Sequence, residues 1–230
     1  MRVLGLLGGM SWESSIEYER IINERVREAH GGTASADLII RSFNFADIER
    51  LQEDGRWYEA GQLLASEARK LQIAGAEAIV LCTNTMHAVS SQIETMISVP
   101  IIHIADPTGE AIRARGLRTV GLLGTRYTME QDFYVERIRN NWNVNVIIPN
   151  AADRTSVHAV IYDELVQGIV SEASRDVYLG VVDRLIASGA EGIISGCTEI
   201  ELLISPSDLS VPLFPTARLH AEAAATFALS

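Results

Sequence analysis

Internal repetition is the feature that most constrains the fold of this chain. Three segments of its first half return in the second half, in the same order and at nearly the same offset. The matching pairs are VLGLLGGMSWES (3–14) with TVGLLGTRYTME (119–130), AGAEAIVLCTNT (74–85) with SGAEGIISGCTE (188–199), and VPIIHIADPT (99–108) with VPLFPTA (211–217). A repeat of this kind predicts that one chain builds two similar structural units.

Each unit is predicted to have an α/β fold. Short apolar runs of strand length alternate with longer amphipathic stretches, which is typical of a mostly parallel sheet flanked by helices. Strands are expected at 2–7, 38–42, 78–82, 100–104, 118–123, 144–148, 192–195 and 212–214. Helices are expected at 14–29, 57–74, 128–141, 161–170 and 174–188, with a last one after Pro215.

The two units are predicted to be lobes related by a pseudo-two-fold axis, with the active site in the cleft between them. The boundary is expected near 105–117. Residues 1–105 and 215–230 would then form the first lobe and residues 106–214 the second. Ligands of open parallel sheets bind beyond the carboxyl ends of the strands, so the residues that follow the repeated strands are candidate site residues.

The composition excludes several kinds of partner. A formal net charge of −11 on 230 residues argues against nucleic acid and anionic membranes. No apolar run approaches the ~20 residues that span a bilayer, and the N-terminus lacks the pattern of a secretory signal. These features predict a cytoplasmic protein with two free cysteines. No cluster has metal-ligand spacing, and GLLGGMS is neither a dinucleotide fingerprint nor a P-loop, so no metal or cofactor is expected.

The repeat also compares the residues that follow the two central strands. When the copies are aligned, Thr83 falls opposite Cys197 and Cys82 falls opposite Gly196. Neighbours on a strand point to opposite faces, so Cys82 is predicted to pack inside its lobe. Cys197 is predicted to be functional, because backbone amides of a helix starting at Thr198 would favour its thiolate.

The motifs GLLGGMSWES, CTNTMH and GCTEIELL, together with the duplicated layout, resemble the aspartate/glutamate racemase superfamily over essentially the whole chain. The resemblance implies an isomerase that works without pyridoxal phosphate and that places one cysteine of each lobe on opposite faces of the substrate Cα. One thiolate removes the Cα proton and the other thiol returns a proton. The family's first cysteine immediately precedes Asn-Thr, and here Thr83 precedes Asn84 and Thr85.

This departure predicts an asymmetric pair of catalytic groups. A threonine hydroxyl is a far weaker acid than a thiol, so Thr83 can donate a proton to a carbanion but is a poor base. The resemblance implies that the second-lobe cysteine acts on the L-enantiomer. The prediction is therefore a racemase that prefers L-aspartate or L-glutamate, with Cys197 as base and Thr83 as proton donor. Family resemblance and the frequency of symmetric dimers favour a homodimer.

Polar residues near the same strand ends are candidates for holding the substrate. The candidates are Met10, Ser11, Gln52, Asn84, Thr85, Thr125, Tyr127, Thr198 and Glu199. Ser11 is equally well explained as a helix N-cap, and Arg126 as a solvated surface group. Gln52 lies, with Arg50, in a loop at 42–55 that is expected to overhang the cleft. His87 and His158 are interpreted as structural.

Two other functions remain open from the residues. A single cysteine facing a non-thiol is compatible with a decarboxylase or another isomerase of the same superfamily. A two-lobed α/β chain could also bind an amino acid without catalysis, and the absence of the first cysteine keeps that alternative open.

Overall fold

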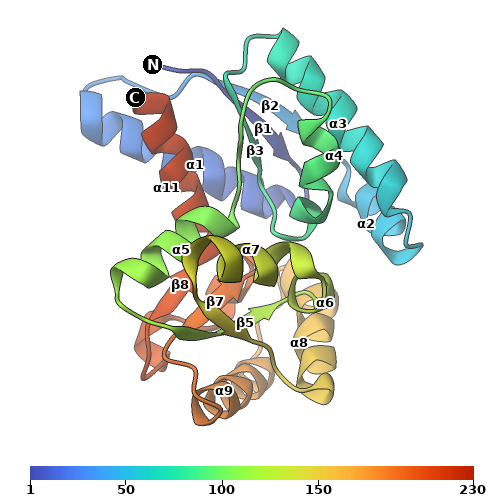
Figure 1. Cartoon of the computed structure of the whole chain (residues 1–230), viewed down its shortest axis with the longest axis vertical. Helices are drawn as coiled ribbons and strands as arrows, with labels where there is room; N and C mark the ends of the chain where they lie inside the picture. The colour runs from blue at the N-terminus through green and yellow to red at the C-terminus, as the bar shows by residue number, and fades with distance from the viewer. The chain divides into compact units, whose positions relative to one another are not determined.

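The computed structural model describes residues 1–230, which divide into two compact units. The first unit contains Met1–Ile104 and His220–Ser230, and the second contains Ala105–Leu219 (Figure 1). None of the helices has both the length and the apolar character needed to cross a bilayer.

Each unit contains one parallel four-stranded sheet. The elements of the first unit are β1 (Leu4–Gly8), α1 (Trp12–His30), β2 (Leu38–Ser42), α2 (Phe45–Glu53), α3 (Trp57–Ile73), β3 (Ala78–Leu81), the 3₁₀ helix η1 (Thr85–Val89), α4 (Ser90–Glu94) and β4 (Ile101–Ile102). The elements of the second unit are α5 (Ala105–Ala114), β5 (Thr119–Gly124), α6 (Arg126–Glu130), α7 (Asp132–Trp142), β6 (Asn145–Ile147), α8 (Ala151–Asp163), η2 (Leu165–Gln167), α9 (Glu172–Ala187), β7 (Ile193–Gly196), α10 (Ile200–Leu203), η3 (Pro206–Asp208) and β8 (Leu213–Pro215). The last helix, α11 (Thr216–Leu229), crosses the division between the units.

The two sheets have the same topology. The strand order is β2-β1-β3-β4 in the first unit and β6-β5-β7-β8 in the second. Since the chain moves outward from β1 to β2 and then crosses back to β3, right-handed connections place α1 and α3 on opposite faces of the first sheet (Figure 1). The predicted fold class, two mostly parallel sheets each flanked by helices, is confirmed.

The repeated Gly-Leu-Leu-Gly segment is explained by packing inside each unit. A Cβ on Gly5 would lie 2.9 Å from Ala76 Cβ and 3.1 Å from Leu71 Cβ. In the second unit, a Cβ on Gly121 would lie 2.9 Å from Leu185 Cδ1. The same close approach of helix to strand therefore selects glycine in both copies.

The observed elements differ from the sequence prediction at several places. The expected helix at 161–170 is wrong, because α8 occupies Ala151–Asp163 and begins where the Asn150 side chain accepts the Asp153 N–H at 3.1 Å. The predicted helix at 128–141 is two helices, α6 and α7. The expected loop at 42–55 contains helix α2, in which Ile48 is fully buried.

Candidate functional site

The sheet register places Thr83 and Cys197 at equivalent positions of their units. Leu81 of β3 pairs with Leu7, and Ser195 of β7 pairs with Leu123, the counterpart of Leu7 in the repeat. Thr83 and Cys197 each lie two residues beyond these pairs. Each residue therefore follows the central part of its sheet at the carboxyl end, where parallel sheets bind ligands.

Cys82 belongs to the core of the first unit. Its side chain is fully buried, and its backbone N–H donates to the Leu7 carbonyl at 2.9 Å. Burial raises the pKa of the Cys82 thiol far above its ordinary value, because a thiolate would lose its hydration there. The thiol at this position is a packing group and not a base.

Thr83 is half-buried, and both its backbone N–H and its backbone carbonyl form hydrogen bonds. Its N–H donates to the Leu81 carbonyl at 2.8 Å. Its own carbonyl oxygen lies 2.8 Å from Nδ1 of His87, one turn further along the chain. These two bonds fix the backbone of Thr83, and with it the direction of the Cα–Cβ bond, at the end of β3.

Cys197 is half-buried and is paired with a carboxylate. Its thiol donates to Oε2 of Glu199 at 2.9 Å, and the Glu199 side chain is buried. Burial raises the pKa of Cys197 well above its ordinary value, and the neighbouring charge of Glu199 raises the pKa further. Backbone N–H groups of Thr198 and Glu199 act in the opposite direction but are outweighed.

The expectation that backbone amides from Thr198 onward favour the Cys197 thiolate is correct in direction, but these amides do not decide the net shift of the pKa. The helix that follows, α10, has only four residues, and it begins at Ile200 instead of Thr198. The dominant influences are desolvation and the buried Glu199 carboxylate. In this structure Cys197 is a thiol whose proton is held against Glu199.

Replacing Glu199 by glutamine is expected to move the ionisation of Cys197 to lower pH, because both the charge and the accepting carboxylate raise the thiol pKa. The measurement is the alkylation rate of Cys197 by iodoacetamide as a function of pH, read by mass spectrometry of the Cys197 peptide. Glu201→Gln, at an exposed carboxylate two residues further on, is the control and should leave the profile unchanged. An unchanged profile in Glu199→Gln would contradict the assigned cause.

Several predicted binding residues also have clear structural contacts. Ser11 caps α1 by accepting the Ser14 N–H at 3.4 Å, and Thr125 caps α6 by accepting the Thr128 N–H at 3.3 Å. Met10 is buried next to Ser11. Both units therefore begin the first helix after β1 or β5 with a buried hydroxyl cap, although the repeat aligns Ser11 with Tyr127 and not with Thr125.

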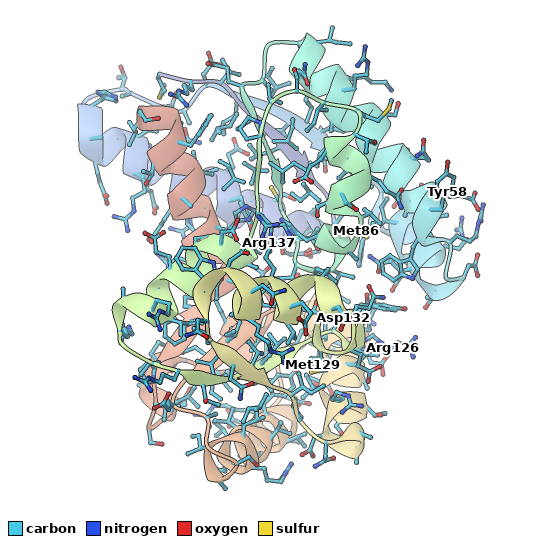
Figure 2. All side chains as sticks on the ribbon, in the orientation of Figure 1. Tyr58, Met86, Arg126, Met129, Asp132 and Arg137 are labelled. Atoms are coloured by element: carbon cyan, nitrogen blue, oxygen red, sulfur yellow. The ribbon has the colours of Figure 1, made fainter.

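Gln52 is buried on α2, and its Nε2 lies 3.0 Å from the Met86 sulfur, which Figure 2 labels on η1. Arg50, from the same helix, is exposed and lies 3.6 Å from Asp47. Of the two residues expected to overhang the site, Gln52 is therefore a buried amide and Arg50 is a solvated cation.

The remaining candidates lie beside the two strand ends or on α6. Asn84 and Thr85 are buried at the start of η1, and Thr198 is half-buried beside Cys197. Tyr127 is half-buried, with its ring 5.9 Å from the His158 ring. Arg126, which is labelled in Figure 2, is exposed. Its guanidinium lies over the ring of Tyr127, with Cζ 5.2 Å from the ring centroid.

Two features are not apparent from the sequence: the contact of Ser195 with Cys197, and the clustering of His87, interpreted as structural, with two other histidines. Ser195 is buried, and its hydroxyl donates to the Cys197 carbonyl at 3.2 Å. His87, His103 and His220 form a buried cluster in the first unit, with the ring centroid of His87 4.5 Å from that of His103 and 5.5 Å from that of His220. The position of Ser195 two residues before Cys197 was the available signal for the first feature. No local pattern links the three histidines.

No group of three or more His, Cys, Asp or Glu side chains is arranged to hold a metal ion. The polar groups at the two strand ends are hydroxyls, a thiol, an amide and a carboxylate. Such groups can form hydrogen bonds with a polar organic ligand and can exchange protons with it.

Comparison with known proteins identifies the family. The sequence profile of the Asp/Glu/Hydantoin racemase family matches residues 7–224. The chain belongs to this family. It is an isomerase of the racemase type, which favours catalysis over simple ligand binding.

Solved structures and a curated relative agree with this assignment. The chain is similar to the crystal structure of a candidate Asp/Glu racemase from Yersinia pestis, with 51% identity, full coverage of both chains and a TM-score of 0.94. It is also similar to the crystal structure of an aspartate racemase homologue from Pyrococcus horikoshii OT3, with 32% identity, full coverage of both chains and a TM-score of 0.85. The broad specificity amino-acid racemase RacX of Bacillus subtilis is 21% identical, over 96% of this chain and 95% of its own length.

Proposed function

We propose that this racemase acts on aspartate and glutamate without a cofactor, that Cys197 is the base for the L-enantiomer, and that Thr83 is the proton donor. The observation that carries the proposal is the register: the two equivalent strand ends present one thiol and one hydroxyl. The unequal acidity of these groups predicts a preference for the L-enantiomer as substrate.

The proposed reaction conserves atoms and charge. The Cys197 thiolate takes the Cα proton, so the Cα–H bond breaks, an S–H bond forms, and the electron pair delocalises into the substrate carboxylate. The Thr83 hydroxyl, directly or through a water molecule, gives a proton to the opposite face of Cα. Solvent then restores the Thr83 proton and removes one from Cys197, so no proton is consumed.

Glu199 is proposed to couple substrate binding to activation of Cys197. In the free enzyme the pKa of the thiol is raised by burial and by the Glu199 carboxylate. The ammonium group of an amino acid bound beside Glu199 would offset the carboxylate charge and favour the thiolate. A thiolate with a raised pKa is also a stronger base toward a weakly acidic carbon.

Hydrogen-bond donors near the strand ends are proposed to hold the substrate carboxylates. Asn84, Thr85 and Thr198 lie within two residues of the two proton-transfer residues. Such donors would stabilise the charge that develops on the α-carboxylate when Cα is deprotonated. Met10, Ser11, Gln52, Thr125 and Tyr127 stay predictions as further substrate contacts, as do cytoplasmic localisation and a homodimer.

The experiment that tests the function is exchange of the Cα proton in deuterium oxide. Wild-type protein is expected to incorporate deuterium into L-aspartate or L-glutamate and to form the D-enantiomer, as followed by proton NMR and chiral chromatography. Alkylation of the protein with iodoacetamide at alkaline pH should abolish both signals, because the proposed base is a thiol. Release of CO₂ from disubstituted malonates without exchange of either amino acid would support the decarboxylase alternative instead.

A further inference from the structure

A buried histidine that the proposed reaction does not use forms a hydrogen bond with the backbone of Thr83. His87 is fully buried. Its Nδ1 lies 2.8 Å from the Thr83 carbonyl oxygen, and the backbone N–H of Ile104 donates to its Nε2 at 3.2 Å. The ring therefore bridges the strand end after β3 and the segment after β4.

These two contacts determine the tautomer of His87. A backbone N–H can only donate, so Nε2 of His87 is the acceptor for Ile104. Burial lowers the pKa of the His87 imidazole well below its ordinary value, and the neighbouring His103 and His220 lower the pKa further. The ring is therefore neutral, carries its one proton on Nδ1, and donates it to the Thr83 carbonyl.

A second histidine holds the adjoining segment in place. His220 lies where the chain returns to the first unit, and its Nε2 is 2.5 Å from the Ile102 carbonyl. Since a carbonyl only accepts, Nε2 of His220 carries the proton, and Nδ1 accepts from the Tyr18 hydroxyl at 2.8 Å. Ile102 and Ile104 are thus both held by buried imidazoles of defined tautomer.

The second unit has a corresponding contact made by a different side chain. The Cys197 carbonyl, which is equivalent to that of Thr83, accepts from the Ser195 hydroxyl at 3.2 Å. The Ser195 carbonyl in turn accepts from Thr216, the repeat counterpart of Ile104, at 2.8 Å. In both units, a buried side-chain donor fixes the carbonyl of the residue that the proposed reaction uses.

We propose that His87 is a positioning residue for proton donation: its Nδ1–H···O=C bond to Thr83 sets where the Thr83 hydroxyl stands relative to the substrate Cα. The inference rests on the proposed function. It assigns His87 a role in only one of the two proton transfers, the one made by Thr83. Removal of the Cα proton by Cys197 does not depend on this bond.

Two amide substitutions separate the two hydrogen bonds of His87. The asparagine amide nitrogen falls near the position of Nδ1, so His87→Asn keeps a donor for the Thr83 carbonyl. The glutamine amide falls near Nε2, so His87→Gln keeps the contact with Ile104 but not the donor to Thr83. Both variants leave an uncharged polar side chain in the same buried site.

The readout is the ratio between deuterium recovered in L-aspartate and D-aspartate formed, measured in deuterium oxide. His87→Gln is expected to raise this ratio at least ~10-fold, because Cys197 still removes the Cα proton but the Thr83 hydroxyl is displaced from the Cα carbanion. His87→Asn should stay within about 3-fold of wild type, since the donor to Thr83 is retained. In a Thr83→Ala background, His87→Gln should not change the ratio further, because its target is already absent.

Three results would overturn the role of His87. One is a parallel loss of exchange and product in His87→Gln, which is the signature of a general structural defect. Another is full retention of both exchange and product formation in that variant, which also leaves the ratio unchanged. The third, which needs no variant, is an Nε2–H or doubly protonated His87 ring at pH 7 in the ¹⁵N NMR spectrum of the wild-type protein.

Failure of the proposed function gives a different signature. Wild-type protein that exchanges neither amino acid would overturn the racemase assignment to aspartate and glutamate, and with it the positioning role of His87. An exchanging wild type with an unaltered His87→Gln ratio would overturn the role of His87 alone. If His87→Gln fails to fold, the tautomer and the His87→Asn ratio still decide the inference.

Discussion

Replacing Cys197 by alanine is expected to abolish exchange of the Cα proton of L-aspartate and to lower kcat/KM by ~10³-fold or more, because the variant has no thiolate at this strand end. Glu199 is the nearest carboxylate, and a carboxylate is far less basic than a thiolate. The measurement is deuterium incorporation followed by NMR, with chiral chromatography for the product. The loss should appear in both readouts, since formation of the carbanion precedes formation of the D-enantiomer.

Cys82→Ala is the matched control for this prediction. The Cys82 side chain is fully buried in the first unit, so its removal should cost about 1 kcal/mol of unfolding free energy by urea denaturation. Activity should remain within a few-fold of wild type. An inactive Cys82→Ala protein that is still folded would show that the register of the site is displaced by one residue.

Replacing Thr83 by alanine is expected to lower formation of D-aspartate from L-aspartate by ~10²-fold or more while exchange into L-aspartate continues. The reason is that Cys197 still removes and returns the proton on its own face. Racemisation has an equilibrium constant of one, so kcat/KM measured from D-aspartate must fall by the same factor. The two directions can differ only through matched changes in kcat and KM.

Thr83→Ser separates the hydroxyl from the methyl group. Serine retains the proton donor, so D-aspartate formation should be largely preserved, whereas alanine removes the donor. The measurement is the rate of D-enantiomer formation in each variant, normalised to exchange into L-aspartate. A Thr83→Ala protein that racemises like wild type would contradict the assigned role of Thr83.

The sequence-based prediction and the structure differ in segments that have no strong local pattern. The segment at 42–55 is rich in polar residues, so its sequence predicts a loop, whereas the structure has helix α2 there with one apolar face centred on Ile48. The start of α8 depends on the Asn150 cap, which follows immediately after Pro149. Helix boundaries of this kind are decided by one or two hydrogen bonds, which a periodicity analysis does not detect.

The sequence by itself determined the repeated architecture and the alignment of its strand ends. Each short apolar run predicts a strand from local sequence alone, and the repeat places the same series of strands in both halves. The two sheets accordingly have the same strand order, and Thr83 and Cys197 occupy equivalent positions after β3 and β7. Gly5 and Gly121 occupy matching positions of the repeat, and each allows a close contact between strand and helix inside its own unit.

Only the tertiary structure decided the protonation states at the candidate site. The pKa of Cys197 is raised because folding buries its thiol beside the Glu199 carboxylate. The sequence shows that the two residues are close along the chain but not that the Glu199 side chain points to the thiol. His87 is neutral and donates to Thr83 because Ile104, His103 and His220 are brought around it from distant parts of the chain. Burial and long-range hydrogen bonds set these states, and neither is encoded in a local pattern.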